Sequence, residues 1–222
     1  MVSDRRKVNM RHAEYYIQTM IATIREYGLR NHRVLDAMMK TPRHLFIPED
    51  VPLDTAYGDH PVPIGEAQTI SQPFTVAFML DLLDPRTGNN VLEVGAGSGW
   101  NAALIKCLVG SKGRITALEI DQWLFLKTDQ LLKRLAIDAE VHCRDGSKGF
   151  HENAPYDRII VTCAAPKIYD AWVKQLKPGG IIVAPVGVYT QDMIRGFKEG
   201  SGLEIEHHGA FQFVPMRFSA QE

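Results

Sequence analysis

The sequence predicts an α/β fold of the Rossmann-like, doubly wound type, in which helices cover both faces of a mostly parallel sheet. Three observations lead to this prediction. Apolar runs of strand length alternate with helical patterns between residues 90 and 186, a glycine-rich loop joins the first run to a helix, and the last part of the chain alternates like antiparallel edge strands. Alternation of strands and helices is typical of a parallel sheet with helical crossovers.

The central part of the chain supplies the strands and helices of this sheet. The expected strands are short apolar runs at residues 90–94, 114–120, 139–143, 156–162 and 181–186. The expected helices have apolar residues at helical spacing and lie at residues 75–83, 100–109, 123–135 and 168–176. A Lys-Pro-Gly-Gly stretch at residues 177–180 leads from the last helix into the last strand of this group.

Two further helices are expected near the N-terminus. Apolar side chains recur at helical spacing between residues 9 and 27, and Gly28 is placed to end that helix. A second helix should start after Asn31 as its N-cap, turn Val34, Leu35 and Met38 inward, and end at Thr41, before a proline. These two helices form an N-terminal helical lead-in.

Two regions flank the predicted core. Residues 47–73 are rich in Pro, Gly and Asp and lack sustained periodicity, so we expect a long loop, ordered or disordered, of the kind that is commonly functional. Residues 193–218 predict two antiparallel edge strands around a turn at residues 199–202. A length of 222 residues suits one domain, divided into the lead-in and loop (1–73), the core (74–190) and the C-terminal strands (191–222).

Composition limits the partners and the compartment. A formal net charge of -1 argues against a surface dominated by phosphate contacts, so nucleic acid is not expected as a partner. Cys107, Cys143 and Cys163 share no CxxC spacing and predict neither a disulfide framework nor a zinc site. The start of the chain is basic and polar, and no apolar run approaches the ~20 residues of a membrane span. We therefore expect a cytoplasmic monomer without a membrane partner or a metal.

The glycine-rich loop predicts a cofactor site. Gly95, Gly97 and Gly99 follow an apolar strand and open a helix, so the backbone can approach a ligand closely. A tight turn without a ligand would have the same glycines. The spacing G-x-G-x-G followed by Trp100 departs from the dinucleotide fingerprint, whose last small residue allows close helix packing, and no phosphate-binding G-x-x-x-x-G-K-[ST] sequence is present. The glycine pattern that remains is that of class I methyltransferases, which use S-adenosyl-L-methionine.

Three acidic residues support a nucleoside ligand. Glu119 ends the next strand, where a carboxylate can accept hydrogen bonds from both ribose hydroxyls. Asp145, followed by Gly146, comes after the third strand and can contact an adenine amino group. Glu93 lies inside an apolar strand, where a carboxylate needs a partner such as the ammonium of a methionine moiety. Each one alone is more often a turn or surface residue, but three at successive strands are a less common coincidence.

One segment upstream of the glycine loop resembles a known family. The stretch Gly-Glu-Ala-Gln-Thr-Ile-Ser-Gln-Pro at residues 65–73 is similar to a signature of the protein-L-isoaspartate O-methyltransferases. Further stretches follow in family order at residues 42–48, 56–59, 145–146, 154–157, 161–166, 175–180, 185–187 and 213–216. The resemblance covers nearly the whole chain, with mild departures at Glu66-Ala67, Trp100 and Cys163.

The resemblance implies a reaction and a set of site residues. The reaction is methyl transfer from S-adenosyl-L-methionine to the α-carboxylate of an L-isoaspartyl residue, whose ester then collapses to a succinimide and returns some normal aspartate. The cofactor would contact Gln68, Thr69, Ile70, Ser71, Glu93, Gly95, Gly97, Ser98, Gly99, Glu119, Asp145 and Gly146. The substrate would contact Thr69, Ile70 and Val214.

The resemblance also assigns Ser71 as the catalytic residue. A carboxylate is already a nucleophile at neutral pH, so the displacement needs no general base, and orientation alone can supply several kcal/mol. Ser71 would then act by hydrogen bonding and orientation. The competing interpretation is that Ser71 caps the following helix. No G-x-S-x-G sequence is present, which disfavours a nucleophilic serine of that type.

Other features leave alternatives open. The eight histidines include no H-E-x-x-H, and adjacent His207 and His208 are expected at the surface. Aromatic and apolar residues at 211–216 could border a substrate cleft or belong to the core. Two other functions share the same motifs, namely methylation of an unmodified aspartate or other carboxylate in a dedicated peptide or small molecule, and a non-catalytic relative of the fold.

Overall fold

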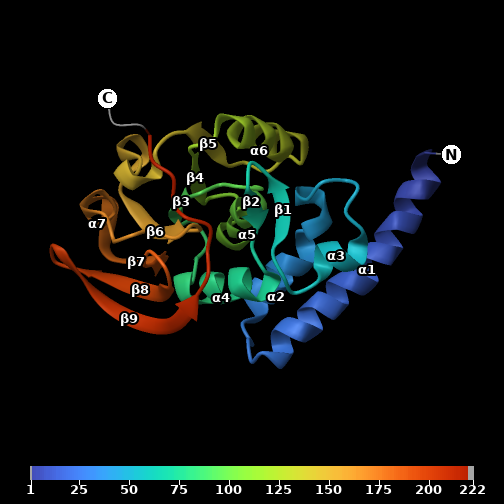
Figure 1. Ribbon diagram of the computed structural model, residues 1–222, viewed down its shortest axis with the longest axis horizontal. Coiled ribbons are helices and arrows are strands. Elements are labelled where there is room, and N and C mark those ends of the chain that lie inside the picture. Colours follow the sequence, from blue (N-terminus) through green and yellow to red (C-terminus); the bar gives the residue numbers. More distant parts are fainter. Residues whose placement is uncertain (1, 220–222) are drawn as a thin grey trace.

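A seven-stranded sheet forms the centre of the molecule, in the order β5-β4-β3-β6-β7-β8-β9 (Figure 1). The computed structural model describes residues 2–219, with side-chain burial from residue 13 onward. The strands are β3 (Asn90–Val94), β4 (Arg114–Glu119), β5 (Glu140–Cys143), β6 (Tyr156–Val161), β7 (Leu176–Val186), β8 (Gln191–Glu199) and β9 (Gly202–Phe211). The strands β5, β4, β3, β6 and β7 are mutually parallel, and β8 and β9 continue the sheet as antiparallel strands. The predicted fold class is confirmed.

The strand order creates a point where the chain changes direction across the sheet. From β3 the chain moves outward through β4 to β5, then returns to place β6 on the other side of β3. In open parallel sheets, ligands bind outside the carboxyl ends of the strands at such a switch point. The carboxyl ends of β3, β4 and β6 are therefore the expected location of a site.

Side chains of alternate strand positions separate two buried layers. In β3, Val91 packs into the cluster that also holds the main helices, whereas Leu92 and Val94 pack into a second cluster on the opposite face. This separation follows from the two-residue period of a strand. The first face is covered by the helices α4 (Pro73–Leu83), α5 (Trp100–Val109) and α6 (Gln122–Arg134), and behind them lie α1 (Val2–Glu26) and α2 (His32–Lys40). The second face is covered by α7 (Asp170–Gln175) and by short 3-10 turns at Gly146–Lys148 and His151–Asn153.

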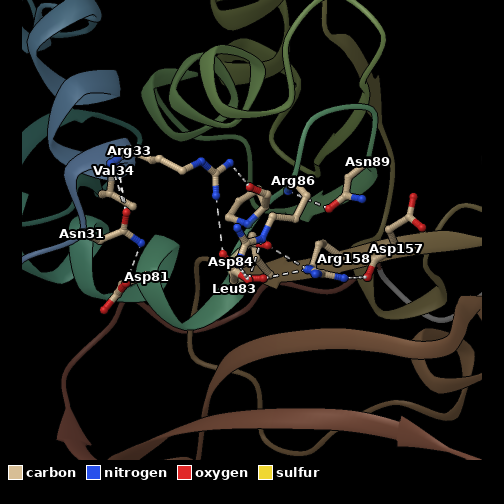
Figure 2. Close-up of polar contacts among 11 residues, drawn as sticks. Asn31, Arg33, Val34, Asp81, Leu83, Asp84, Arg86, Asn89, Asp157 and Arg158 are labelled. Atoms are coloured by element: carbon tan, nitrogen blue, oxygen red, sulfur yellow. Dashed lines mark hydrogen bonds and ion pairs between the residues drawn. The ribbon is translucent and has the colours of Figure 1, made fainter.

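The N-terminal helices agree with the sequence prediction, with one difference in length. The first helix begins at Val2, earlier than the expected residue 9, and Ile17, Ile21 and Ile24 are buried on its inner face. Asn31 caps α2 by accepting hydrogen bonds from the backbone of the next turn. Figure 2 shows that the same side chain also reaches Asp81 of α4, at 2.8 Å, so the cap fixes α2 against the sheet-covering helix.

A polar network lies at the amino ends of β3 and β6, on the side of the sheet opposite to the carboxyl ends of these strands. Arg158 of β6 donates to the carbonyl oxygens of Leu83 at 2.8 Å and Asp84 at 3.2 Å (Figure 2). Asp84 in turn lies 3.5 Å from Arg33 and is bonded by Arg86. This network anchors the end of α4 far along the helix from its start at Pro73.

The segment from residue 47 to residue 73 contains more regular structure than expected. It is ordered, with a short helix α3 (Leu53–Tyr57) and a hairpin of β1 (Val62–Gly65) and β2 (Gln68–Ile70). The hairpin turns at Glu66 and Ala67, whose φ values of 50° and 54° are left-handed. Such turns normally carry Gly, Asn or Asp, which is why the sequence pattern did not indicate a hairpin.

Smaller differences concern element ends near the C-terminus. The helix expected at residues 168–176 is limited to Asp170–Gln175, because Leu176 already pairs with Tyr156 in the sheet. Strand β7 therefore begins five residues before the expected residue 181. The two edge strands flank the turn at Gly200, as expected. None of the described helices is long and apolar enough to cross a membrane.

Candidate active site

A cavity that is partly open to solvent lies at the carboxyl ends of β3, β4 and β6. Its wall combines three parts of the chain that are distant in sequence: the strand β2 with the residue after it, the glycine loop with the strand ends, and the segment after β9. Most of the predicted site residues line it, namely Gln68, Thr69, Ile70, Ser71, Glu93, Gly95, Gly97, Ser98, Glu119, Gly146 and Val214. Gly99 and Asp145 are not among the lining residues.

The glycine loop needs its glycines for two different reasons. Gly95 has a φ of +98°, and an added Cβ would lie 2.6 Å from Oγ1 of Thr162, which follows β6. Gly99 has a φ of +82° at the start of α5, and its added Cβ would lie 2.9 Å from a methyl carbon of Thr128 in α6. Gly95 therefore allows the loop to cross the end of β6, while Gly99 allows α5 and α6 to pack closely.

Glu119 connects the end of β4 to the glycine loop. Its Oε2 accepts a hydrogen bond from the backbone N–H of Gly97 at 2.9 Å, and its Oε1 accepts one from Asp121 at 3.0 Å. The residue is only 7% exposed, yet it borders the cavity. Each carboxylate oxygen has a second lone pair, so the group can still accept the hydroxyls of a ribose.

Glu93 is a carboxylate with one satisfied and one unsatisfied oxygen. It is fully buried in β3, where Oε1 accepts from the Asn101 side-chain amide at 2.9 Å and Oε2 has no hydrogen-bond partner among the described residues. Burial raises the pKa of Glu93 to about 8, the Asn101 hydrogen bond opposes this shift, and the nearby Glu119 adds to it. A buried acceptor in this state fits a cationic ligand group. The ammonium group of a methionine moiety has the required charge and donors.

Asp145 is already engaged by protein donors. Its Oδ1 accepts from the backbone and hydroxyl of Ser147 at 2.9 and 2.7 Å, and its Oδ2 accepts from the backbone and hydroxyl of Ser219 at 3.2 and 3.0 Å. Burial alone would raise the pKa of Asp145, but these hydrogen bonds lower it below the usual value. The neighbouring Gly146 borders the cavity, and Trp172 holds its carbonyl at 2.7 Å.

Ser71 lies between the end of β2 and the start of α4 and borders the cavity. The helix does not use it as a cap: the N-cap position is Gln72, which forms no side-chain capping bond. Asp59 satisfies this end instead, accepting from the backbone N–H of Phe74 at 2.9 Å and from the Gln72 amide at 2.7 Å. The structure therefore contradicts the helix-capping interpretation of Ser71, which borders the cavity instead.

The segment after β9 forms another wall of the cavity. Figure 1 shows this red segment rising from the end of β9 across the ends of the central strands. It is held there by backbone hydrogen bonds of Ala164 with Val214 at 2.8 Å and with Met216 at 2.9 Å. Residues 213–216 border the cavity, as one of the two sequence interpretations expected. Phe211 instead stacks on Phe78 of α4, with ring centroids 5.6 Å apart.

Several lining residues were absent from the sequence prediction. They include Val76, Met79, Asn101, Thr162, Cys163, Arg144 and Arg217. Thr162 could have been found, because the residue after β6 must lie beside the end of β3 in a parallel pair; its hydroxyl donates to the Gly95 carbonyl at 2.5 Å. Burial raises the pKa of the Cys163 thiol to about 12, so this thiol is neutral at physiological pH.

The histidines and other possible metal ligands lie elsewhere. His207 is exposed and bonds Asp192, and the partly buried His208 packs edge-on against Phe78. Across the part of the chain that the structure describes, no group of three His, Cys, Asp or Glu residues could hold a metal ion.

The fold and cavity together have the features of a nucleoside-cofactor site in a methyltransferase of class I. A glycine loop follows β3, the carboxylate Glu119 ends β4, and Glu93 inside β3 is a buried carboxylate whose Oε2 has no partner among the described residues. Comparison with known proteins agrees. The family model described as "Protein-L-isoaspartate(D-aspartate) O-methyltransferase (PCMT)" matches residues 16–221. This chain belongs to the protein-L-isoaspartate (D-aspartate) O-methyltransferase family.

Individual relatives extend over most of the chain. A protein-L-isoaspartate O-methyltransferase of Methanopyrus kandleri is 44% identical over 204 residues, covering 90% of each chain. A solved protein-L-isoaspartate O-methyltransferase structure superposes with a TM-score of 0.83 at 28% identity, covering 90% of this chain and 65% of that longer chain. A solved Plasmodium falciparum structure in complex with S-adenosyl-L-homocysteine has a TM-score of 0.80 at 22% identity, covering 90% and 97% of the two chains, and shows the same fold.

Proposed function

We propose that this chain transfers the methyl group of S-adenosyl-L-methionine to the α-carboxylate of L-isoaspartyl residues in damaged proteins and so starts their repair. The observation that carries the proposal is one cavity whose wall contains Ser71, Glu119 and Glu93, with the Glu93 Oε2 lacking a hydrogen-bond partner among the described residues. Family membership supports both the donor and the acceptor.

The residues of the cavity suit the parts of the methyl donor. Glu93 holds the ammonium group, the backbone at Gly95, Gly97 and Ser98 lies against the methionine part, and Glu119 accepts the ribose hydroxyls. Gly146 and the carboxylate of Asp145 lie at the adenine end, with Asp145 keeping its serine partners. When bound, S-adenosyl-L-methionine supplies a methyl carbon activated by its sulfonium sulfur.

The acceptor side of the site orients a nucleophile that is already charged. A carboxylate oxygen of the isoaspartyl residue forms a bond to the methyl carbon while the carbon–sulfur bond breaks, and the electron pair of that bond stays on sulfur. Thr69, Ile70 and Val214 contact the substrate, and the Ser71 hydroxyl donates a hydrogen bond that orients the carboxylate. The products are a methyl ester, which closes to a succinimide with loss of methanol, and S-adenosyl-L-homocysteine.

The backbone of this region suits a peptide of variable sequence. Within residues 2–219, β2 pairs with β1 alone, and the segment 213–216 is held by Ala164 through main-chain bonds. An extended peptide between these two segments can bind through backbone hydrogen bonds, which tolerate many side chains. A repair enzyme needs this tolerance because its substrates share a damaged residue rather than a sequence.

The test compares two peptides that differ only in one linkage. The purified chain should transfer a labelled methyl group to an L-isoaspartyl peptide, giving a base-labile ester, and leave the aspartyl peptide of the same sequence unlabelled. Equal labelling of both peptides would contradict the repair assignment and favour a methyltransferase for ordinary carboxylates. Binding of S-adenosyl-L-homocysteine without labelling of either peptide would favour a non-catalytic relative.

The proposal extends to the assembly and compartment. We propose that the enzyme is monomeric and cytoplasmic. Cys107, Cys143 and Cys163 are free thiols, as is usual in a reducing cytoplasm. A net charge of -1 favours proteins over nucleic acid as substrates. Light scattering of the purified chain at micromolar concentration tests the monomer directly.

A further inference from the structure

Arg43 is a buried cation whose partners are backbone carbonyls. Its side chain is completely inaccessible to solvent, although it lies in a short 3-10 turn (Arg43–Phe46) that precedes the loop region. The guanidinium donates from Nε to the carbonyl of Ala56 and from Nη1 to the carbonyl of Ser71, both at 2.8 Å. Nη2 adds longer bonds to His60 at 3.3 Å and Ile70 at 3.5 Å. The side chain thus gathers carbonyls from two segments, one of which carries the proposed catalytic residue.

The other side of the guanidinium faces Trp100. The Arg43 Cζ atom lies 4.8 Å from the centre of the indole ring. Trp100 is itself only 1% exposed, and its Nε1 donates to the Thr41 carbonyl at 3.0 Å. Because Trp100 directly follows Gly99, the stack joins Arg43 to the end of the glycine loop. This contact gives a structural role to Trp100, the residue at which the loop departs from the dinucleotide fingerprint.

The charge of Arg43 is compensated in an unusual way. Asp59 is the acidic group with the largest electrostatic effect on Arg43. Its carboxylate, however, accepts its hydrogen bonds from Gln72 and Phe74. Burial lowers the pKa of Arg43 to about 9 while Asp59 and Tyr57 oppose the shift, so the group is charged at neutral pH. Burying a cation without a directly paired anion is costly. The dipoles of the bonded carbonyls and the face of the Trp100 indole stabilise the buried charge. A buried cation that costs stability is expected where it fixes the position of other groups.

Arg43 and Asp59 both bind the segment of residues 70–74, Arg43 as a hydrogen-bond donor and Asp59 as an acceptor. Arg43 binds the carbonyls of Ile70 and Ser71, and Asp59 binds donors of Gln72 and Phe74. The backbone on both sides of Ser71 is therefore fixed by a cation and an anion. The backbone position from which the Ser71 side chain projects is therefore fixed.

We propose that Arg43 is a positioning residue for methyl transfer, which sets the placement of Ser71 relative to the glycine loop by bonding the Ile70–Ser71 carbonyls on one side and stacking on Trp100 on the other. This inference rests on the proposed function, because it concerns the same site. A displacement of about 1 Å in a reacting group can cost about 100-fold in rate. Lysine cannot replace arginine here, because its ammonium lacks the planar fork that reaches several carbonyls and stacks on an indole.

The test compares Arg43→Lys with Arg158→Lys. Arg158 is a matched control, because it also donates to backbone carbonyls (Figure 2). It lies near the amino end of β6 and does not line the cavity. Three quantities are measured on each variant and the unaltered chain: the affinity for S-adenosyl-L-homocysteine, kcat and KM for an isoaspartyl peptide, and hydrogen exchange of a peptic fragment spanning residues 66–74.

The expected result separates positioning from general loss of stability. Arg43→Lys should lower kcat by about 10- to 100-fold, with KM and cofactor affinity changed less than about threefold. Exchange in residues 66–74 should rise at least about fivefold, on the scale of lost local hydrogen bonds. Arg158→Lys should lower the melting temperature and leave both kcat and exchange in this fragment unchanged.

The outcomes that overturn the inference differ from those that overturn the function. Unchanged exchange in residues 66–74 of Arg43→Lys rules out the positioning role whether or not the chain is active, and so does a kcat no lower than that of Arg158→Lys. Failure of the unaltered chain to methylate the isoaspartyl peptide rejects the proposed function instead. If Arg43→Lys does not fold, the variant Trp100→Phe replaces it, because this change removes the hydrogen bond to Thr41 and shrinks the ring that stacks on Arg43. Trp100→Phe should show the same pattern with a smaller fall in kcat. An unchanged kcat together with unchanged exchange would reject the inference.

Discussion

Glu93 and Asn101 form a hydrogen bond of 2.9 Å that leaves half of a buried carboxylate free. The two residues lie in the strand before the glycine loop and in the first turn of the helix after it. Asn101 therefore fixes the rotation of the carboxylate so that Oε2 remains without a partner at the cavity wall. The glycine loop is bracketed by this pair.

The first prediction concerns cofactor affinity. Glu93→Gln keeps the shape but cannot become an anion when the ammonium group binds, and it should weaken S-adenosyl-L-homocysteine binding by about 10- to 100-fold, the range expected for a lost hydrogen bond between charged groups. Isothermal titration calorimetry measures the change. An analogue that lacks the amino group should bind the variant and the unaltered chain equally well; a difference between them would place the ammonium elsewhere.

The second prediction concerns stability against pH in the absence of cofactor. The pKa of Glu93 is raised from 4.5 to about 8, mainly by burial, so the folded chain holds a proton that the unfolded chain releases. The contribution of Glu93 to the free energy of unfolding should then decrease as pH rises from 4.5 towards 8. Glu93→Gln removes this titration, and its melting temperature should gain on that of the unaltered chain across the same interval. A constant difference between pH 5 and pH 8 would argue against the raised pKa.

The third prediction separates the roles of the hydroxyls. Ser71→Ala should lower kcat by about 10- to 100-fold through lost orientation, and leave the affinity for S-adenosyl-L-homocysteine within about twofold. Ser111→Ala, at an exposed turn, serves as the control and should change neither quantity. Steady-state kinetics with an isoaspartyl peptide and calorimetry give the two values. A collapse of cofactor affinity in Ser71→Ala would assign this serine to the cofactor pocket.

The fourth prediction compares two left-handed glycines. Gly95→Ala adds a Cβ 2.6 Å from the Thr162 hydroxyl, whereas Gly88→Ala has a similar φ of +84° and nothing within 4 Å. Both should lose about 1 kcal/mol of stability from the backbone conformation. Only Gly95→Ala should also weaken cofactor binding, by more than about tenfold, because the loop must move. Equal binding by the two variants would show that the loop adapts without cost.

The sequence predicted the core of the fold well, for a local reason. The strand Asn90–Val94 and the helix Trp100–Val109 have the predicted bounds, because apolar patterning and glycine position are properties of short stretches. The hairpin was not predicted, because its turn at Glu66 and Ala67 adopts left-handed backbone without glycine. A local sequence pattern does not indicate a backbone conformation that depends on contacts with the rest of the fold.

The candidate site was predicted in part, and the rest depended on distant contacts. Glu119 and Ser71 border the cavity, Glu119 because its place at the end of a strand indicated it and Ser71 because the family resemblance did. Arg43 was seen only as part of a family-like stretch, since its acceptors are carbonyls up to 28 residues away in the chain. The bond of Asp145 to Ser219 spans 74 residues, and nothing in either local sequence announces it.

Arg217 borders the cavity and bonds the carbonyl of Glu66 at 2.5 Å and the carboxylate of Asp121 at 3.2 Å. The first of these contacts joins residues 151 apart in sequence. Contacts between such distant residues form slowly, because the intervening chain must first lose its freedom. During refolding, the central helices and strands should therefore appear before the cavity closes. Helical circular dichroism should recover first and cofactor binding later, so that a newly folded molecule passes through a stage in which it has its sheet but cannot yet hold its methyl donor.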